Sequence, residues 1–269
     1  MLITVNGLVI RSYPSGDHDR VVHILTEDHG RLSVMVKGGS SSRTAPALSC
    51  TQLFTYGNYE LYRGTGGDLY WFRGGSVLSS FYGLSADVSR MALAAYLCDV
   101  TSELAVEEGD VEETGILLRM LLNSLYVISE SLKPLPLVKA AFELRAVSLM
   151  GYMPDLTGCD TCGEAYPEQA YLDILNGRVV CADCRTKLNR LYGREREREE
   201  GMSRPICPLS PSVLAAMRYI LSATDKKIFS FAMKDQEEER ALARVTESFL
   251  LHQLERDFET LHFYNSMAE

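Results

Sequence analysis

Cys159-Asp160-Thr161-Cys162 and Cys181-Ala182-Asp183-Cys184 are two CxxC turns that decide the fold of the segment around them. Each turn can direct two sulfurs to one side, and the eighteen residues between the turns are typical of four-cysteine zinc sites. Because four protein ligands leave no open coordination position, the sequence predicts a structural Zn²⁺ held by Cys159, Cys162, Cys181 and Cys184.

The segment between the two turns is expected to be a β-hairpin. Strands are predicted over Ala170–Leu175 and Arg178–Cys181, joined by a type I′ turn at Asn176-Gly177. A remnant site that holds no metal and a redox pair are the alternatives to zinc. A thioredoxin-like role is disfavoured because neither cysteine pair follows a βαβ pattern. The three other cysteines, for which no function is predicted, are Cys50, Cys98 and Cys207.

Upstream of the cysteines, residues 1–80 are expected to be all-β. Their apolar segments are rich in β-branched and aromatic residues, several alternate with a period of two, and Gly-rich turns separate them. Five short strands over this length predict a small barrel, an OB-fold in preference to an SH3-like barrel. The expected strands are Ile3–Arg11, Arg20–Thr26, Arg31–Lys37, Gln52–Arg63 and Asp68–Ser76.

Residues 81–269 are expected to form a helical domain that contains the zinc finger as an insert at 156–190. The pattern of apolar residues and of Gly and Pro punctuation predicts helices. The Arg/Glu run at 194–200 is expected to be a frayed helix with solvent-exposed ion pairs. The predicted class is α+β, with an OB-fold barrel at 1–80. The expected helices cover 86–108, 112–131, 137–150, 211–223 and 237–260.

Composition excludes several classes of protein. The chain has 269 residues, 46% hydrophobic and 23% charged, which is ordinary for a globular protein and excludes a disordered acidic tail, a collagenous repeat and a coiled-coil rod. No stretch approaches the ~18 apolar residues of a membrane span, and the N-terminus lacks the pattern of a secretory signal. We therefore expect a cytoplasmic protein.

Charge is distributed unequally along the chain. The net charge of -9 excludes a wholly basic nucleic-acid binder. Residues 1–80 hold seven Lys/Arg and six Asp/Glu, a net charge of +1, so the remaining residues carry -10. The acidity belongs to the helical part, and the barrel is free to meet a polyanion.

Basic residues alternate with aromatic residues in the predicted barrel. Cations along the backbone and rings that stack on bases are the features that hold single-stranded nucleic acid. The alternative is that the aromatic residues fill the barrel core. The candidate DNA-binding cations are Lys37, Arg43, Arg20, Arg63, Arg11, Arg31 and Arg73. The aromatic residues among them are Phe54, Tyr56, Tyr59, Tyr62, Tyr70, Trp71 and Phe72.

No catalytic motif accompanies these features. The sequence lacks G-x-S-x-G, H-E-x-x-H and the GK[ST] ending of a phosphate loop. None of the five histidines supplies the H-x-E of a zinc deaminase. We expect the protein not to be an enzyme, because a metal-dependent enzyme would also need an open position on the metal.

The stretch Gly151-Tyr152-Met153-Pro154-Asp155-Leu156, with Cys159, Cys162 and Gly163 after it, resembles the RecO family of bacterial recombination mediators. Further segments that carry the resemblance are Gly7–Arg11, Asp19–Val22, Leu25–Gly30, Val36–Gly38, Glu60–Gly64, Ala95–Leu97 and Phe142–Arg145. The resemblance covers nearly the whole chain. In one place the sequence departs from the family: the segment after Lys37, often rich in Arg and Lys, has Arg43 as its only cation.

The resemblance implies a mediator that binds single- and double-stranded DNA and anneals complementary strands. Such proteins act in the bacterial cytoplasm, in association with the nucleoid. They work with RecR, and often RecF, to load RecA onto DNA coated by single-stranded DNA-binding protein. The rival interpretation is a zinc-stabilised protein–protein adaptor that does not bind DNA directly.

The resemblance also implies a site for the acidic C-terminal tail of single-stranded DNA-binding protein. Such a tail needs an apolar groove with a cation at its edge. The helices at 112–131 and 137–150 offer apolar faces beside four cations. The alternative is that these apolar residues are core and the cations a solvated rim. The apolar residues are Leu121, Leu125, Val138 and Leu149, and the cations are Arg119, Lys133, Lys139 and Arg145.

Overall fold

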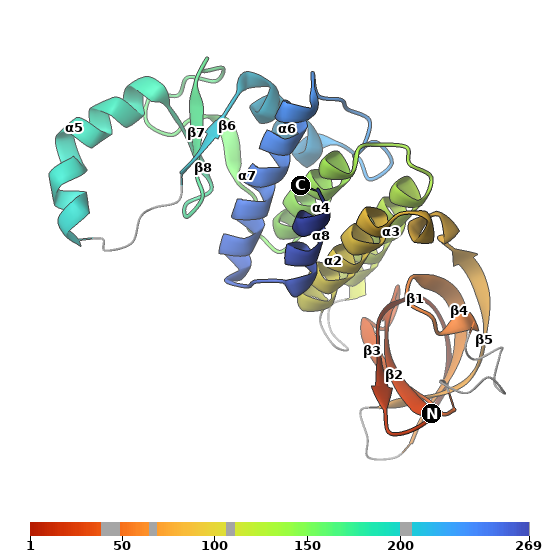
Figure 1. Cartoon of the computed structure of the whole chain (residues 1–269). Coiled ribbons are helices and arrows are strands. Elements are labelled where there is room, and N and C mark those ends of the chain that lie inside the picture. Colours follow the sequence, from red (N-terminus) through yellow and green to blue (C-terminus); the bar gives the residue numbers. More distant parts are fainter. Residues whose placement is uncertain (39–48, 65–68, 106–110, 200–205, 269) are drawn as a thin grey trace. The chain divides into compact units, whose positions relative to one another are not determined.

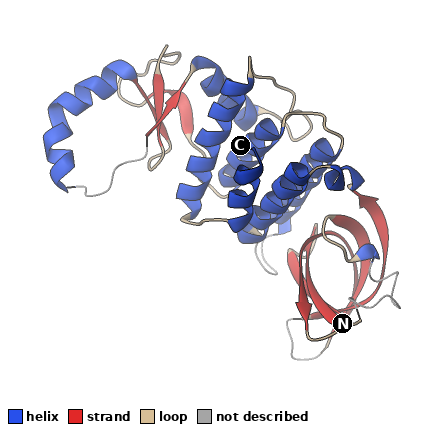
Figure 2. Ribbon diagram, viewed as in Figure 1, coloured by secondary structure: helices blue, strands red, loops and turns tan. Residues whose placement is uncertain are grey.

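The computed structural model describes residues 1–38, 49–64, 69–105, 111–199 and 206–268, with side chains for all of them except 111–112, 191–199 and 268. Contacts divide the chain into two compact units. The first comprises Met1–Leu135 and Phe258–Glu269, and the second comprises Pro136–Asp257. Strands precede helices in the first unit, whereas the second combines helices with a small sheet (Figure 2). The predicted α+β class, with an N-terminal sheet followed by helices, is confirmed.

Five strands of the first unit form a closed barrel in the order β1-β2-β3-β5-β4 (Figure 1). Neighbouring strands are antiparallel except β3 and β5, which are parallel. β1 pairs with both β2 and β4, and its register with β2 shifts between Val9 and Arg11, a bulge that bends the strand. The strands are β1 (Leu2–Ser15), β2 (Asp19–Thr26), β3 (Arg31–Val36), β4 (Thr55–Arg63) and β5 (Tyr70–Ser80).

The barrel core is built from alternate residues of each strand, as the period of two predicts. Tyr59 is fully buried and donates to the backbone carbonyl of Cys50 over 2.8 Å. Burial raises the pKa of the Tyr59 hydroxyl. Some of the aromatic residues therefore belong to the core, as the alternative interpretation holds. Aliphatic residues of the core include Ile3, Val5, Val9, Val22, Ile24, Leu32, Val34, Val36 and Leu61.

Three helices of the first unit follow the barrel in the sequence, and a fourth lies at the C-terminal end of the described residues. They are the 3-10 helix η2 (Tyr82–Ala86), α2 (Val88–Leu104), α3 (Val111–Ser129) and α8 (Glu259–Ala268). The Asp87 side chain caps α2 by accepting from the amides of Ser89 and Arg90. Helix α8 packs against α2 (Figure 1), where the rings of Tyr96 and Phe258 meet edge to face at 5.7 Å between centroids.

The second unit contains the cysteine-bearing segment. Its helices are α4 (Leu135–Leu149), α5 (Ala182–Glu199), α6 (Pro211–Ser222) and α7 (Gln236–Leu254). A four-stranded sheet has the order β6-β8-β7-β9, with β6 (Asp155–Cys159), β7 (Ala170–Asp173), β8 (Arg178–Cys181) and β9 (Ile206–Leu209). Arg218 of α6 fastens this segment to the helices, since its guanidinium donates to the carbonyls of Leu156 and Ala165 over 2.6 and 2.7 Å.

Three details of the second half differ from the sequence prediction. Helix 237–260 is two helices, because Glu255 adopts a left-handed conformation (φ 48°) that ends α7. The type I′ turn at Asn176-Gly177 is wrong. Asp173 pairs with Arg178, four residues lie between them, and only Gly177 of the two has positive φ. Strand β9 was not predicted, and it extends the inserted sheet past residue 190.

The division into units also differs from the change of secondary structure near residue 80. Helix α2 contacts strand β1 and helix α8, so the barrel shares one unit with the first helices and the last one. None of the helices within the described ranges combines the length and the apolar character that a bilayer-spanning segment needs.

Candidate metal centre and nucleic-acid interface

The four predicted metal ligands come together in one cluster. The Sγ atoms of Cys159, Cys162, Cys181 and Cys184 all lie within 4.8 Å of one another. The Sγ atoms of Cys162 and Cys181 are 3.8 Å apart. A tetrahedron of thiolates with bonds of about 2.3 Å has edges of about 3.8 Å, so this separation fits Zn²⁺.

Backbone geometry positions the sulfurs. Gly163, which follows the first turn, has φ +76°, and its amide donates to the Cys159 carbonyl over 2.8 Å. This left-handed position favours glycine. The amide of Cys181 donates to Cys159 Sγ over 3.3 Å, and the amide of Cys184 donates to Cys181 Sγ over 3.5 Å. Strand β8 and the first turn of α5 thus point their amides at the sulfurs, which stabilises negative charge there.

The protonation of the cluster shows why a cation fits it. Burial raises the pKa of Cys159, but amide donors, first of all Cys181, outweigh burial and lower this pKa to about 6. Hydrogen bonds with the side chains of Cys181 and Cys162 raise the pKa of Cys184 to about 12. Neighbouring thiolates repel one another, so the cluster disfavours several negative charges at once. A divalent cation would relieve this repulsion and favour four thiolates.

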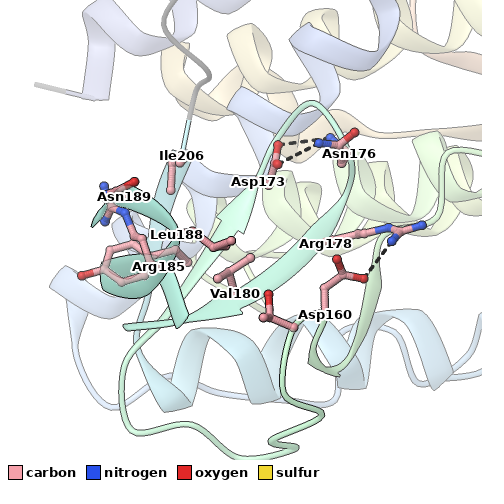
Figure 3. Close-up of a pocket in the computed structure, with 11 residues that line it drawn as sticks. Asp160, Asp173, Asn176, Arg178, Val180, Arg185, Leu188, Asn189 and Ile206 are labelled. Atoms are coloured by element: carbon pink, nitrogen blue, oxygen red, sulfur yellow. Dashed lines mark hydrogen bonds and ion pairs between the residues drawn. The ribbon is translucent and has the colours of Figure 1, made fainter. Parts of the chain in front are cut away.

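An ion pair connects the first CxxC turn to the strand that leads to the second. Asp160 lies between Cys159 and Cys162, and Arg178 is the first residue of β8. Arg178 Nη1 lies 2.8 Å from Asp160 Oδ1, and Figure 3 shows the two side chains pointing toward each other. Both side chains are about half exposed, so this ion pair contributes little to stability.

The pocket beside this ion pair has a volume of about 490 Å³ and is lined by residues of β7, β8, α5 and β9 (Figure 3). Its polar side chains largely contact one another. Asn176 Nδ2 donates to Asp173 Oδ2 over 2.8 Å, and the Arg185 guanidinium lies 4.0 Å from the centroid of the Tyr171 ring. The charged and amide side chains that line this pocket are therefore largely engaged with other residues of the pocket.

Three of the predicted DNA-binding cations lie beside aromatic rings at one end of the barrel. Lys37 Nζ is 4.8 Å from the centroid of the Trp71 ring. The guanidinium of Arg73 is 5.5 Å from the Tyr62 ring. The guanidinium of Arg63 is 5.4 Å from the Tyr70 ring. Lys37 and Arg73 are exposed, and so are Tyr62 and Trp71.

Two of the other predicted cations, Arg11 and Arg31, are held by the protein itself. Arg11 pairs with Asp99 of α2, with Nη2 3.0 Å from Oδ1. Arg31 donates to the carbonyl of Ser102 over 2.8 Å. Arg20 is half-buried, and its Nε is a buried atom without a hydrogen-bond partner among the described residues. Arg43 lies in 39–48, outside the described residues. The structure thus separates Lys37 and Arg73, which are exposed beside aromatic rings, from Arg11 and Arg31, which brace the barrel.

The four predicted tail-binding cations are not alike. Lys139 is 2% exposed and bonded to Glu143 and Glu247, so it is neither an accessible cation at the edge of a groove nor the solvated rim cation of the alternative interpretation. Arg145 donates to the carbonyls of Leu221 and Ala223 over 2.7 Å each. It therefore caps the C-terminal end of α6.

The other two cations of this set lie in the first unit. Arg119 is about half exposed and pairs with Glu27 over 2.9 Å, and Lys133 is half-buried. Lys139 and Arg145 belong to the second unit. The apolar residues Leu121, Leu125 and Val138 are fully buried and belong to the core, as the alternative interpretation holds.

The remaining cysteines are not part of the four-sulfur cluster. Cys50 and Cys98 are buried, and Cys207 on β9 is half-buried. Burial raises the pKa of all three thiols. No sequence-based role was predicted for them, and their positions are those of packing residues.

Family models match almost the whole chain. The model described as "Recombination protein O N terminal" matches residues 1–81, and the one described as "Recombination protein O C terminal" matches residues 85–262. The chain belongs to the RecO family. The predicted resemblance is thereby confirmed, and both CxxC turns lie within the matched RecO region.

Curated relatives agree with the RecO assignment. A DNA repair protein RecO from Acetivibrio thermocellus is 26% identical over 266 residues, which cover 98% of this chain and 97% of that protein. A DNA repair protein RecO from Symbiobacterium thermophilum is 32% identical over 188 residues, covering 68% of this chain and 71% of that protein.

Sequence reasoning missed two apolar residues on the outer face of the barrel. Leu2 is 64% exposed and pairs with Tyr62, and Met35 is half-buried and pairs with Trp71. The alternation of inward and outward residues along β1 could have revealed Leu2. Leu2 shares a face of the strand with exposed Thr4 and lies on the opposite face from buried Ile3.

Proposed function

We propose that this protein is a non-enzymatic recombination mediator that binds single- and double-stranded DNA and anneals complementary strands. The observation that carries the proposal is the match of RecO family models to residues 1–81 and 85–262. In this proposal the protein acts in the bacterial cytoplasm at the nucleoid. With RecR, and in some pathways RecF, it helps to load RecA onto DNA coated by single-stranded DNA-binding protein.

The proposed DNA-binding domain is the barrel at residues 1–80, and the proposed fold of that barrel is an OB-fold. The strand order β1-β2-β3-β5-β4, with β1 paired to β4, supports this assignment, because the OB-fold is a five-stranded barrel of short strands. Residues 81–269 are the proposed helical domain, and the zinc finger is its insert at 156–190.

Phosphate contacts are proposed for Lys37 and Arg73, because both are exposed and lie beside the rings of Trp71 and Tyr62. Arg63, whose guanidinium lies beside the buried Tyr70 ring, stays in the proposal on its sequence position. Annealing needs neutralisation of two polyanions and contacts that tolerate any sequence, and it requires no hydrolytic centre. Arg43 stays in the proposal on its sequence position alone. Arg11 and Arg31 contribute by bracing the barrel against α2.

A structural Zn²⁺ is proposed at Cys159, Cys162, Cys181 and Cys184, supported by the close cluster of sulfurs and by amides that point at two of them. Bound there, the metal would hold the two turns of the insert together. The proposal for the acidic tail of single-stranded DNA-binding protein is kept on Arg119 and Lys133, because Lys139 and Arg145 serve the interior of the second unit.

The test measures binding and annealing with the full chain. Labelled single strands and duplexes are titrated by fluorescence anisotropy at several salt concentrations, and complementary strands are mixed with and without protein in the absence of nucleotide. We expect salt-dependent binding and faster duplex formation. A chain that binds neither DNA form at low salt but captures RecR would instead be the protein–protein adaptor.

A further inference from the structure

A row of apolar and aromatic side chains crosses the outer face of the barrel. Register places Leu2 of β1 opposite Tyr62 of β4, Tyr62 opposite Trp71 of β5, and Trp71 beside Met35 of β3. Directly opposed residues lie on the same face of a sheet. The row, named here the outer row, therefore runs across four adjacent strands, a width of about 14 Å at the usual strand spacing.

The outer row faces outward, and its neighbours in sequence face inward. Leu2 is 64% exposed, Tyr62 40% and Trp71 36%. The adjacent residues Ile3, Leu61 and Tyr70 are buried in the barrel core. Two large aromatic rings, Tyr62 and Trp71, are therefore neighbours on the outer surface of the barrel, outside its core.

Cations surround the outer row. Lys37 lies above the Trp71 ring and Arg73 lies beside the Tyr62 ring, and both cations are exposed. Exposed Glu60 lies on the same face of β4, two residues from Tyr62, and is outnumbered by these cations. The partner that this surface fits is therefore an anion with flat apolar groups, which is the chemistry of unpaired nucleotides.

We propose that the outer row is a stacking platform for the unpaired bases of a single strand, with Trp71 and Tyr62 as the two stacking rings. This inference rests on the proposed DNA-binding function. It adds that the barrel prefers single-stranded DNA to duplex DNA. Bases of a duplex are already stacked and hidden, so a duplex meets only the cations.

The cation–π contacts of Lys37 and Arg73 do not prevent a base from stacking on the same rings. An exposed cation–π contact is weaker than the stacking of a base on an aromatic ring. An arriving base therefore displaces Lys37 or Arg73 from its ring, and the freed cation pairs with the phosphate of the same strand. The contacts in the unbound protein keep the rings and cations at one place before the strand arrives.

The test exploits the single tryptophan of the chain, which is Trp71. The full-length protein is titrated with a short oligothymidylate and with a duplex of the same length, and both tryptophan emission and anisotropy of the labelled DNA are recorded. We expect the single strand to quench Trp71 emission, because a base stacked on indole alters its fluorescence, and the duplex to bind without this quenching.

Variants then separate stacking from charge. Tyr62→Ala should weaken single-strand binding by about tenfold and leave its salt dependence unchanged. Tyr82→Ala is the matched control, since Tyr82 is an 82% exposed tyrosine in η2 outside the outer row. It should leave binding unchanged, and circular dichroism checks that both variants fold.

Three outcomes decide the proposal. Quenching by single strands together with the Tyr62→Ala loss supports it. Single strands that bind by anisotropy without quenching Trp71, and with equal affinity for Tyr62→Ala, overturn the platform and leave the proposed function standing. If neither DNA form binds the wild-type chain at low salt, the proposed function and the platform are both rejected.

Discussion

Lys139 and Glu143 form a buried ion pair one helical turn apart on α4. Lys139 Nζ lies 2.8 Å from Glu143 Oε1 and 2.8 Å from Oε2 of Glu247 on α7, and the Lys139 and Glu143 side chains are 2% and 0% exposed. The Thr246 hydroxyl donates to the other carboxylate oxygen of Glu143 over 2.7 Å. The network joins α4 to α7 with its charges paired and hydrogen-bonded, as buried charges must be.

Removing the cation from this network should destabilise the second unit. Lys139→Ala leaves Glu143 buried without its ammonium partner, so we expect a loss of about 3–5 kcal/mol in the free energy of unfolding. Urea unfolding monitored by circular dichroism measures it. Arg119→Ala is the control, because its exposed pair with Glu27 is worth about 0–1 kcal/mol. Equal, small effects in the two variants would contradict the structural role of Lys139.

The cysteine cluster should contain one zinc ion per chain, and removing one ligand should unfold the insert. Cys162→Ala leaves three ligands, and because metal binding and folding of such a site are coupled, we expect loss of bound zinc and protease cleavage within 156–190. Metal analysis of the purified protein and limited proteolysis measure both effects.

The matched control for the metal site is Cys207→Ala, which removes a half-buried thiol of the neighbouring strand β9. It should retain the zinc. Purified wild-type protein that is folded but contains no metal, and whose proteolysis is unchanged by a chelator, would contradict the zinc site.

Lys37 and Arg31 should differ sharply in their effects on DNA binding. Lys37→Ala should weaken binding to all sequences and lower the salt slope by about one, because it removes one phosphate contact. Arg31→Ala should lower stability instead, since Arg31 donates to the Ser102 carbonyl and hydroxyl over 2.8 and 3.0 Å. Anisotropy titrations over a range of salt distinguish them, and an unchanged slope for Lys37→Ala would remove Lys37 from the interface.

Binding of an acidic, apolar-ended peptide should depend on Arg119 and Lys133. The double variant Arg119→Glu with Lys133→Glu reverses two charges of the first unit, so we expect it to weaken a labelled peptide of about micromolar affinity by tenfold or more. DNA binding by the barrel should be retained. Unchanged peptide affinity in this variant would place the tail site elsewhere, and Lys139 and Arg145 are left intact so that folding is not disturbed.

Charged residues show where sequence reasoning stops. Arg11, Arg31, Lys37 and Arg73 look equivalent in the sequence, since each stands on or next to a strand among apolar neighbours. The partner of Arg11 is Asp99 and that of Arg31 is Ser102, residues far along the chain. Lys37 and Arg73 meet rings instead. Whether a cation is available to a ligand depends on these distant partners.

The sequence by itself determined what local patterns encode. The period of two along the strands and the Gly-rich turns predict the N-terminal sheet, and the CxxC spacing predicts the cysteine cluster, because both depend on residues within a few positions or within one hairpin. The motifs from Gly151 to Gly163 were specific enough to indicate the RecO family, which the family models confirm.

Only the tertiary structure decided the placement of distant segments. The left-handed Glu255 ends α7, so that Phe258 and α8 pack on α2, a return that helical periodicity does not reveal. The buried position of Lys139 and the alignment of Leu2, Tyr62, Trp71 and Met35 likewise depend on which helices pack and which strands pair. The physical reason is that burial and charge pairing are properties of contacts between segments, and strand register converts four separate residues into one surface.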